Sequence, residues 1–321
     1  MTGGIFESVF YFAALVFIGL IAWIGQWGKR YDICRYIVYA MMGLSSAFLI
    51  ALGVFFICVH PNMLSGLSLS MGLCAVPAFI PAVRRGLSKT VFKGLDVSNP
   101  THTWALYIYF ASIILTLFSL TVLYVPSLII EELKTLPIYQ MVIANMIVFV
   151  LFSFIAIGWG ADLSFKQVAA KLGLTRLSRK QVGAMVVTAL VMAFAIQFLE
   201  AGLMVFVPPV IRDTLQQIVK AMHVTGSVGY TLRSACIVGL GAGIGEEILF
   251  RGLMQPLFGL VPTALLFALI HTHYGPTVLL LELFVVGLIL GYIRNRWNTT
   301  AAIIVHGGFD CFAILSSLLH H

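Results

Sequence analysis

The sequence is short of charge. Only 10% of its 321 residues are Asp, Glu, Lys or Arg, whereas 60% are hydrophobic. Soluble globular domains carry about 25% charged and about 45–50% apolar residues. A soluble core could not bury this much apolar surface, so the composition excludes that class. It predicts instead a chain that crosses a lipid bilayer several times.

The charges that are present lack the arrangement of a nucleic-acid-binding surface. The formal net charge is +7, but no basic face carries interleaved aromatic residues. The basic residues cluster in short loops between apolar runs, as membrane topology requires. We therefore expect the bilayer as a partner and expect no nucleic acid.

The sequence also lacks a disulfide framework, a zinc motif and a recognisable leader. It has five cysteines, none in a CxxC pair, and most of them lie inside apolar runs. We interpret them as small packing residues. The N-terminal residues "MTGGIFES" lack the basic region of a cleavable signal peptide, so no such peptide is expected.

Long apolar runs are abundant. About 20 helical residues span the hydrocarbon of a bilayer, and the runs occur at 5–25, 36–59, 65–83, 104–126, 138–160, 182–208, 233–257, 260–274, 277–293 and 299–318. The eighth and ninth runs are short, as a tight hairpin or a re-entrant pair would be. The predicted fold is an all-α, polytopic transmembrane helix bundle of about ten spans, with a range of eight to ten.

The loop charges predict the orientation of these spans. If the N-terminus lies outside and the chain crosses ten times, the inner loops hold 14 Lys and Arg residues and the outer loops 4. The outer four are Lys134, Arg212, Lys220 and Arg233. Basic residues accumulate on the cytosolic side of membrane proteins. Both termini are therefore expected outside.

Three charges interrupt the apolar run "GIGEEILFRG" at residues 243–252. An ionisable residue in mid-membrane costs about 2.5–3.5 kcal/mol on insertion scales, so it usually serves a cavity or a partner. Glu247 and Arg251 are four residues apart and can form an ion pair on one helix face. Glu246 is rotated by about 100° from Glu247 and lacks that partner. An unpaired carboxyl group in apolar surroundings is a candidate general base.

The glycines that precede this motif have helix-packing spacing. In "GLGAGIG", Gly239 and Gly243 form one GxxxG pair, and Gly241 and Gly245 form another. Such pairs let helices approach closely. A nucleotide-binding loop is rejected, because neither a preceding strand nor a βαβ pattern accompanies the glycines.

Two further motifs follow at one-turn spacing. Phe267 and His271 lie in "FALIH", and His306 and Asp310 lie in "HGGFD". Counted at 1.5 Å per residue from the inner helix ends, Glu246, His271 and His306 each lie roughly 10–16 Å into the membrane. One glutamate and two histidines at a common depth can supply a base, a second proton-handling group and an oxyanion donor. Glu200 and Glu282 allow structural and functional interpretations equally, and His273 is interpreted as a polar residue near a loop.

The ordered patterns EExxxR, FxxxH and HxxxN/D resemble the CPBP family of CAAX proteases and bacteriocin-processing (Abi) enzymes, which includes the type II CAAX prenyl endopeptidases. The resemblance covers roughly residues 180–318. It implies a helical membrane bundle whose cavity opens toward the cytosol.

The resemblance also implies a role for each motif residue. Glu246 and His271 would activate the attacking water, and His306 and Asp310 would stabilise the oxyanion. The supporting residues would be Glu247, Arg251 and Phe267. The last motif position is often Asn in the family, and the carboxylate of Asp310 is a poorer oxyanion donor unless it is protonated.

These observations predict two parts of the chain. Residues 1–180 hold N-terminal transmembrane spans of unassigned role and a cytosolic amphipathic loop, and residues 181–321 hold a CPBP-like protease core. The expected enzyme sits in the cell membrane. It hydrolyses a peptide bond of a peptide or protein substrate, membrane-associated or lipidated, near the cytosolic side. The oligomeric state stays open.

Three alternatives remain at this point. The chain could be a catalytically idle immunity or scaffold protein, or a proton-coupled transporter, although it has no repeated halves and its charges form a cluster rather than a path. No cofactor is expected. A zinc peptidase with Glu246, His271 and His306 as ligands stays a variant of the protease hypothesis, although the sequence has no HExxH motif.

Overall fold

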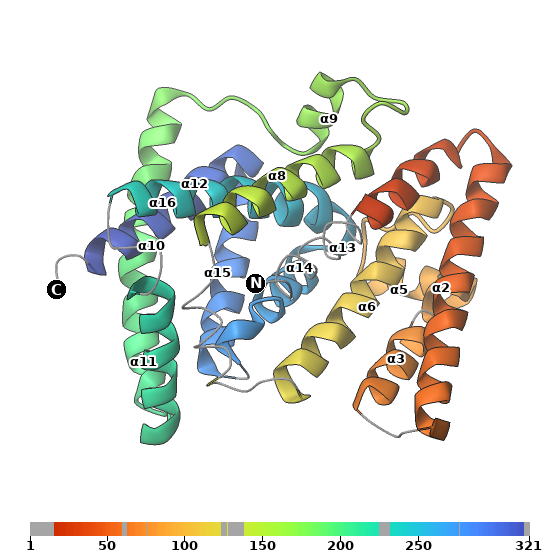
Figure 1. Ribbon diagram of the computed structural model, residues 1–321. Helices are drawn as coiled ribbons and strands as arrows, with labels where there is room; N and C mark the ends of the chain where they lie inside the picture. Colours follow the sequence, from red (N-terminus) through yellow and green to blue (C-terminus); the bar gives the residue numbers. More distant parts are fainter. Residues whose placement is uncertain are drawn as a thin grey trace. The chain divides into compact units, whose positions relative to one another are not determined.

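The computed structural model describes residues 16–59, 63–74, 76–122, 127, 138–224, 232–275 and 277–317. Throughout these ranges the regular elements are helices (Figure 1), and extended pairing is limited to one isolated bridge between Trp159 and Leu163. The all-α class predicted from the sequence is confirmed.

The chain divides into two compact units. Unit 1 contains Met1–Val122, Leu151–Lys171 and Pro256–Gly259, and unit 2 contains Leu123–Val150, Leu172–Gln255 and Leu260–His321. All seven predicted site residues belong to unit 2. The predicted boundary between residues 180 and 181 concerned the extent of the protease core, and it stays a prediction.

Unit 1 is built from apolar helices with two short basic helices, α5 (Pro81–Thr90) and α9 (Phe165–Lys171). Its elements are Val16–Trp27, α2 (Asp32–Val59), α3 (Met63–Cys74), α4 (Val76–Phe79), α5, α6 (Pro100–Val122), the last part of α8 (Ile138–Ile157) and α9. α5 begins with Pro81, a residue suited to the first helical position because its missing N–H would have no helical partner there.

Unit 2 holds the helices that carry the motifs. After the first part of α8 come α10 (Arg179–Met204), α11 (Pro209–Val224), α12 (Leu232–Glu247), the π-helix η1 (Ile248–Met254), α14 (Leu260–Leu269), the 3₁₀ turn η2 (Thr272–Tyr274), α15 (Val278–Arg296) and α16 (Thr299–Ser317). Of α13 (Gln255–Phe258), only Gln255 belongs to unit 2. A capping box starts α10. The Ser178 side chain accepts from the Gln181 amide, and the Gln181 side chain accepts from the Ser178 amide.

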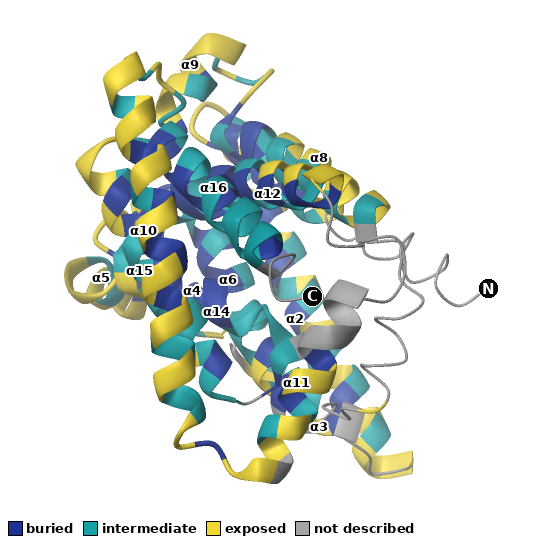
Figure 2. Ribbon diagram, turned by 90° about the vertical axis from the view of Figure 1, so that its left-hand side faces the viewer, coloured by how far each residue is buried: buried dark blue, intermediate teal, exposed yellow. Residues whose placement is uncertain are grey.

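Six helices are long and apolar enough to cross a membrane, or seven if the bent segment Ser65–Thr90 counts as one span. These six are α2, α6, α8, α10, α15 and α16. Many of their large apolar side chains are exposed, and Phe198 on α10 is 78% exposed. Figure 2 shows exposed residues along much of α10. Exposed apolar helices of this length are stable in lipid and unfavourable in water. The chain is an integral membrane protein.

The expected count of about ten spans is not confirmed. The run at 260–274 forms a shorter helix, α14, and the described part of the run at 5–25 is helical from Val16 onward. The run at 233–257 is helical but is divided among α12, η1 and α13. Parts of other predicted spans, at 5–15, 123–126 and residue 318, lie outside the described residues.

Glycines allow α12 to pack closely against two neighbours. A Cβ on Gly239 would lie 2.5 Å from the Gly307 carbonyl oxygen, and one on Gly243 would lie 2.8 Å from the Gly307 amide nitrogen. On another face, a Cβ on Gly245 would lie 2.7 Å from the Met146 Cα, and one on Gly241 would collide with Val142. The two GxxxG pairs therefore serve different neighbours, the first α16 and the second α8.

Candidate active site

The EExxxR motif lies where an α-helix changes into a π-helix. α12 ends at Glu247, and residues Ile248–Met254 wind as η1 before α13 continues the helix. π-Helical turns are rare and occur frequently at functional sites. A side chain from α15 supports this turn, because Arg294 Nε donates to the Arg251 carbonyl oxygen at 3.1 Å.

Glu247 and Arg251 form the ion pair that their spacing predicted. Arg251 Nε lies 3.2 Å from Glu247 Oε2, and both side chains are fully buried. The guanidinium also donates from Nη2 to the Gly287 carbonyl at 3.3 Å, and its central carbon lies 4.4 Å from the centroid of the Phe267 ring. A buried ion pair is tolerated only with such additional contacts, because both charges have lost their water.

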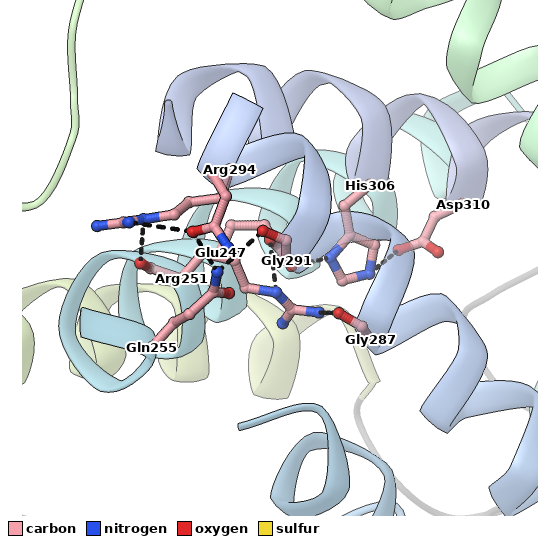
Figure 3. Close-up of polar contacts among 9 residues, drawn as sticks. Glu247, Arg251, Gln255, Gly287, Gly291, Arg294, His306 and Asp310 are labelled. Carbon is pink, nitrogen blue, oxygen red and sulfur yellow. Dashed lines mark hydrogen bonds and ion pairs between the residues drawn. The ribbon is translucent and has the colours of Figure 1, made fainter. Parts of the chain in front are cut away.

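Glu247 uses its other oxygen to hold His306. His306 Nδ1 lies 2.8 Å from Glu247 Oε1, and His306 Nε2 lies 3.6 Å from Asp310 Oδ2 (Figure 3). A carboxylate paired with arginine is ionised and only accepts hydrogen bonds, so Nδ1 carries the proton of this contact. The arrangement fixes the imidazole ring and directs its other nitrogen toward Asp310.

Phe267 lies at the centre of the group. Its ring centroid is 5.0 Å from that of His271, 6.0 Å from that of His306 and 5.3 Å from that of Phe250. His271 follows the end of α14, and its Nδ1 lies 2.7 Å from the Phe267 carbonyl oxygen. Phe267 thus connects the histidine of the second motif with the helices that carry the other two.

Glu246 is outside this contact network. Its side chain is half-buried, and among the described residues no hydrogen bond or ion pair involves it. It lies close enough for its charge to act on Arg251, His306 and Asp310. The structure therefore joins six of the seven predicted residues by direct contacts and leaves the seventh beside them.

The comparison with known families concerns the same residues. Residues 228–312 match the family described as type II CAAX prenyl endopeptidase Rce1-like. This stretch belongs to that family. The Rce1-like region includes all seven predicted site residues and corresponds to about a quarter of the chain. No curated protein and no solved structure matches the chain. An endopeptidase family within an integral membrane protein indicates a membrane-embedded protease.

The alternative zinc-ligand set is not assembled in the Rce1-like region. Both ring nitrogens of His306 face carboxylates, and no hydrogen bond or ion pair of Glu246 is found among the described residues. Within the described part of the chain, no group of three or more His, Cys, Asp or Glu side chains is placed to hold a metal ion. We therefore derive no catalytic step through a metal.

Sequence reasoning missed three polar residues of the Rce1-like region. Gln255 Nε2 donates to the Gly291 carbonyl and to Asn295 Oδ1, each at 2.9 Å, and Arg294 supports η1. Gln255 follows Glu247 and Arg251 at a regular spacing of four residues, and this spacing could have placed it on the same helix face from the sequence.

A second group of polar residues lies in the same unit. Glu282 and Glu200 are close enough for their charges to interact, and Tyr274 lies near both. The buried Oε2 of Glu282 has no hydrogen-bond partner among the described residues. The side chain of His273 lies outside the described part.

Proposed function

We propose that this chain is an intramembrane endopeptidase of the CAAX-protease type. It acts in the cell membrane, on a peptide bond of a membrane-associated or lipidated substrate near the cytosolic side. The observation that carries the proposal is the set of contacts Arg251–Glu247–His306–Asp310 within the Rce1-like region, of which the first three side chains are buried, next to the uncommitted carboxylate of Glu246.

In this proposal Glu246 and His271 prepare the attacking water. A general base must be free to accept a proton, and Glu246 is half-buried without a competing partner among the described residues. His271 Nδ1 faces the Phe267 carbonyl, which only accepts, so this nitrogen is the donor. We assign the other ring nitrogen, Nε2, to the attacking water.

His306 and Asp310 stabilise the oxyanion of the tetrahedral intermediate. The 3.6 Å between Nε2 and Oδ2 exceeds an ordinary hydrogen bond. A substrate oxygen that enters between them can therefore contact both Nε2 of the fixed imidazole ring and the Asp310 side chain. At least one of the two must carry a proton in order to donate to the oxyanion.

The decisive experiment uses the purified protein in lipid vesicles and two matched peptides. Both end in cysteine, two aliphatic residues and a variable residue, and one carries a farnesyl group on the cysteine. We expect mass spectrometry to detect release of the C-terminal tripeptide from the farnesylated peptide. Glu246→Gln should lower this rate by about 10²–10⁴-fold.

Glu200→Gln serves as the matched control, because it changes a half-buried glutamate of the same unit outside the contact network. It should cleave as the wild type does. Cleavage of neither peptide by the wild-type protein would refute the CAAX-type activity. If Glu246→Gln cleaves the peptide at the wild-type rate, Glu246 is not the general base.

A further inference from the structure

The π-helix and α15 are joined by polar contacts at two successive turns. Arg251 and Gln255 are four residues apart, and they donate to the carbonyls of Gly287 and Gly291, which are also four residues apart. Gln255 makes a second contact with Asn295, one turn further along α15. We call Gln255, Gly291 and Asn295 the clasp (Figure 3 shows the Gln255–Gly291 contact).

The clasp is a closely fitted contact. Gln255 is only 4% exposed, and its Nε2 has two N–H groups, which reach two acceptors at 2.9 Å. A Cβ on Gly291 would lie 2.7 Å from Gln255 Oε1 and would collide with Leu260. Glycine at position 291 therefore lets the amide side chain reach the α15 backbone.

The clasp lies one turn from the charged residues. Arg251 is held at its guanidinium by Glu247 and Gly287 and at its carbonyl by Arg294. Because η1 connects the clasp to Glu247, the clasp fixes one end of the turn whose other end carries the carboxylate. The position of that carboxylate sets the 2.8 Å contact with His306.

We propose that Gln255 is a positioning residue of the protease: by clasping α15 it fixes the π-helix, and thereby aims the Glu247 carboxylate at His306. This role rests on the proposed function. In the proposed reaction, Gln255 contacts no reacting atom. A purely structural role for the clasp would lower the amount of folded protein without changing turnover per folded molecule, and this difference makes the two roles separable.

The test is Gln255→Met, which keeps the length of the side chain and removes both N–H donors. Cleavage of the farnesylated peptide is measured per folded molecule, with the folded fraction taken from thermal unfolding in the same vesicles. We expect kcat to fall about 10–10²-fold with KM within about twofold, because small displacements of a catalytic group cost about this much in rate. Gln197→Met is the matched control, since Gln197 on α10 is exposed and donates to Ser316, away from the clasp.

A second pair of variants tests the same role without disturbing a buried residue. Asn295 is exposed, so Asn295→Leu should fold, yet it removes one acceptor of the clasp. Asn295→Asp keeps an acceptor at that position and should retain wild-type kcat, whereas Asn295→Leu should lower it. This pair decides the question if Gln255→Met does not fold.

The outcomes are distinct. Wild-type kcat per folded molecule in both Gln255→Met and Asn295→Leu would overturn the positioning role and leave the protease intact. Equal losses in Asn295→Asp and Asn295→Leu would also overturn it, since hydrogen bonding would then not matter. A wild-type protein that cleaves neither peptide overturns the proposed function, and the positioning role with it.

Discussion

Glu247 connects the buried charges of unit 2. One of its oxygens pairs with Arg251, the other accepts from His306, and all three side chains are buried. Its neighbour Glu246 is only half-buried and makes no such contact within the described residues. Two adjacent and chemically identical side chains thus have opposite surroundings, because about 100° of helical rotation separates them.

The two glutamates should respond differently to the same substitution. Glu247→Gln leaves the Arg251 charge buried without a counter-charge, and breaking a buried pair costs about 3–5 kcal/mol. Glu246→Gln should change the free energy of unfolding by less than about 0.5 kcal/mol. Thermal unfolding of both variants in one detergent checks the contrast, and equal melting temperatures would contradict it.

Turnover should depend on both histidines and not on added metal. His271→Ala removes the residue that is proposed to activate the water together with Glu246, and His306→Ala removes an oxyanion donor. Removing a proton-transfer group lowers the rate about 10²–10⁴-fold, and removing an oxyanion donor lowers it about 10²–10³-fold. Peptide cleavage after exhaustive chelation, with zinc measured in the same samples, provides the readout. A stoichiometric zinc whose removal abolishes cleavage, and whose return restores it, would establish a metalloprotease instead.

At the scale of elements, the contact between α12 and α16 depends on the absence of side chains. A Cβ on Gly307 would lie 2.8 Å from the Gly239 carbonyl oxygen, and backbone cannot move aside as a flexible side chain can. The helices that carry Glu247 and His306 are therefore brought together by glycine rather than by interlocking large residues.

Gly307→Ala should destabilise the protein by about 1–3 kcal/mol, the usual cost of overpacking. Gly183→Ala is the matched control, because Gly183 is exposed on α10 and its added Cβ would meet nothing within 4 Å. That variant should gain about 0.4–1 kcal/mol, since alanine is the better helix former. Thermal unfolding of the two variants, measured side by side, tests this contrast. An equal change in the free energy of unfolding in both variants would contradict it.

Local spacing predicted some elements of the site and missed others. The Glu247–Arg251 pair and the Phe267–His271 contact follow from one-turn spacing, and the structure contains both. The π-helix did not follow from the sequence, because its i→i+5 bonding is supported by contacts from α15, a helix that begins more than twenty residues later. Nor did spacing alone predict that Glu247 would contact His306, which depends on how α12 packs against α16.

For the whole molecule, apolar composition predicted the all-α class and the membrane environment, since those depend on summed properties of long segments. The number of spans was harder to predict. A run such as 260–274 is apolar enough for a span, yet it forms a ten-residue helix followed by a 3₁₀ turn. Hydropathy cannot distinguish a complete span from a short helix buried among others.

Topology is the remaining prediction for the whole molecule. In a background with the five cysteines replaced by alanine, single cysteines at Lys89 and Lys171 should react with an impermeant reagent only from the cytosolic side. A cysteine at Lys220 should react only from the opposite side, as the 14-to-4 distribution of loop charges requires. Labelling of Lys89 and Lys220 from the same side would contradict the predicted orientation.

The close backbone approach of α12 and α16 also bears on how a substrate enters. Two helices in contact through Gly239, Gly243 and Gly307 have no gap between them to widen, so we expect them to move as one rigid body. Glu247 and His306 would then keep their separation throughout turnover. A substrate must therefore reach Glu247 and His306 from outside the contact between α12 and α16.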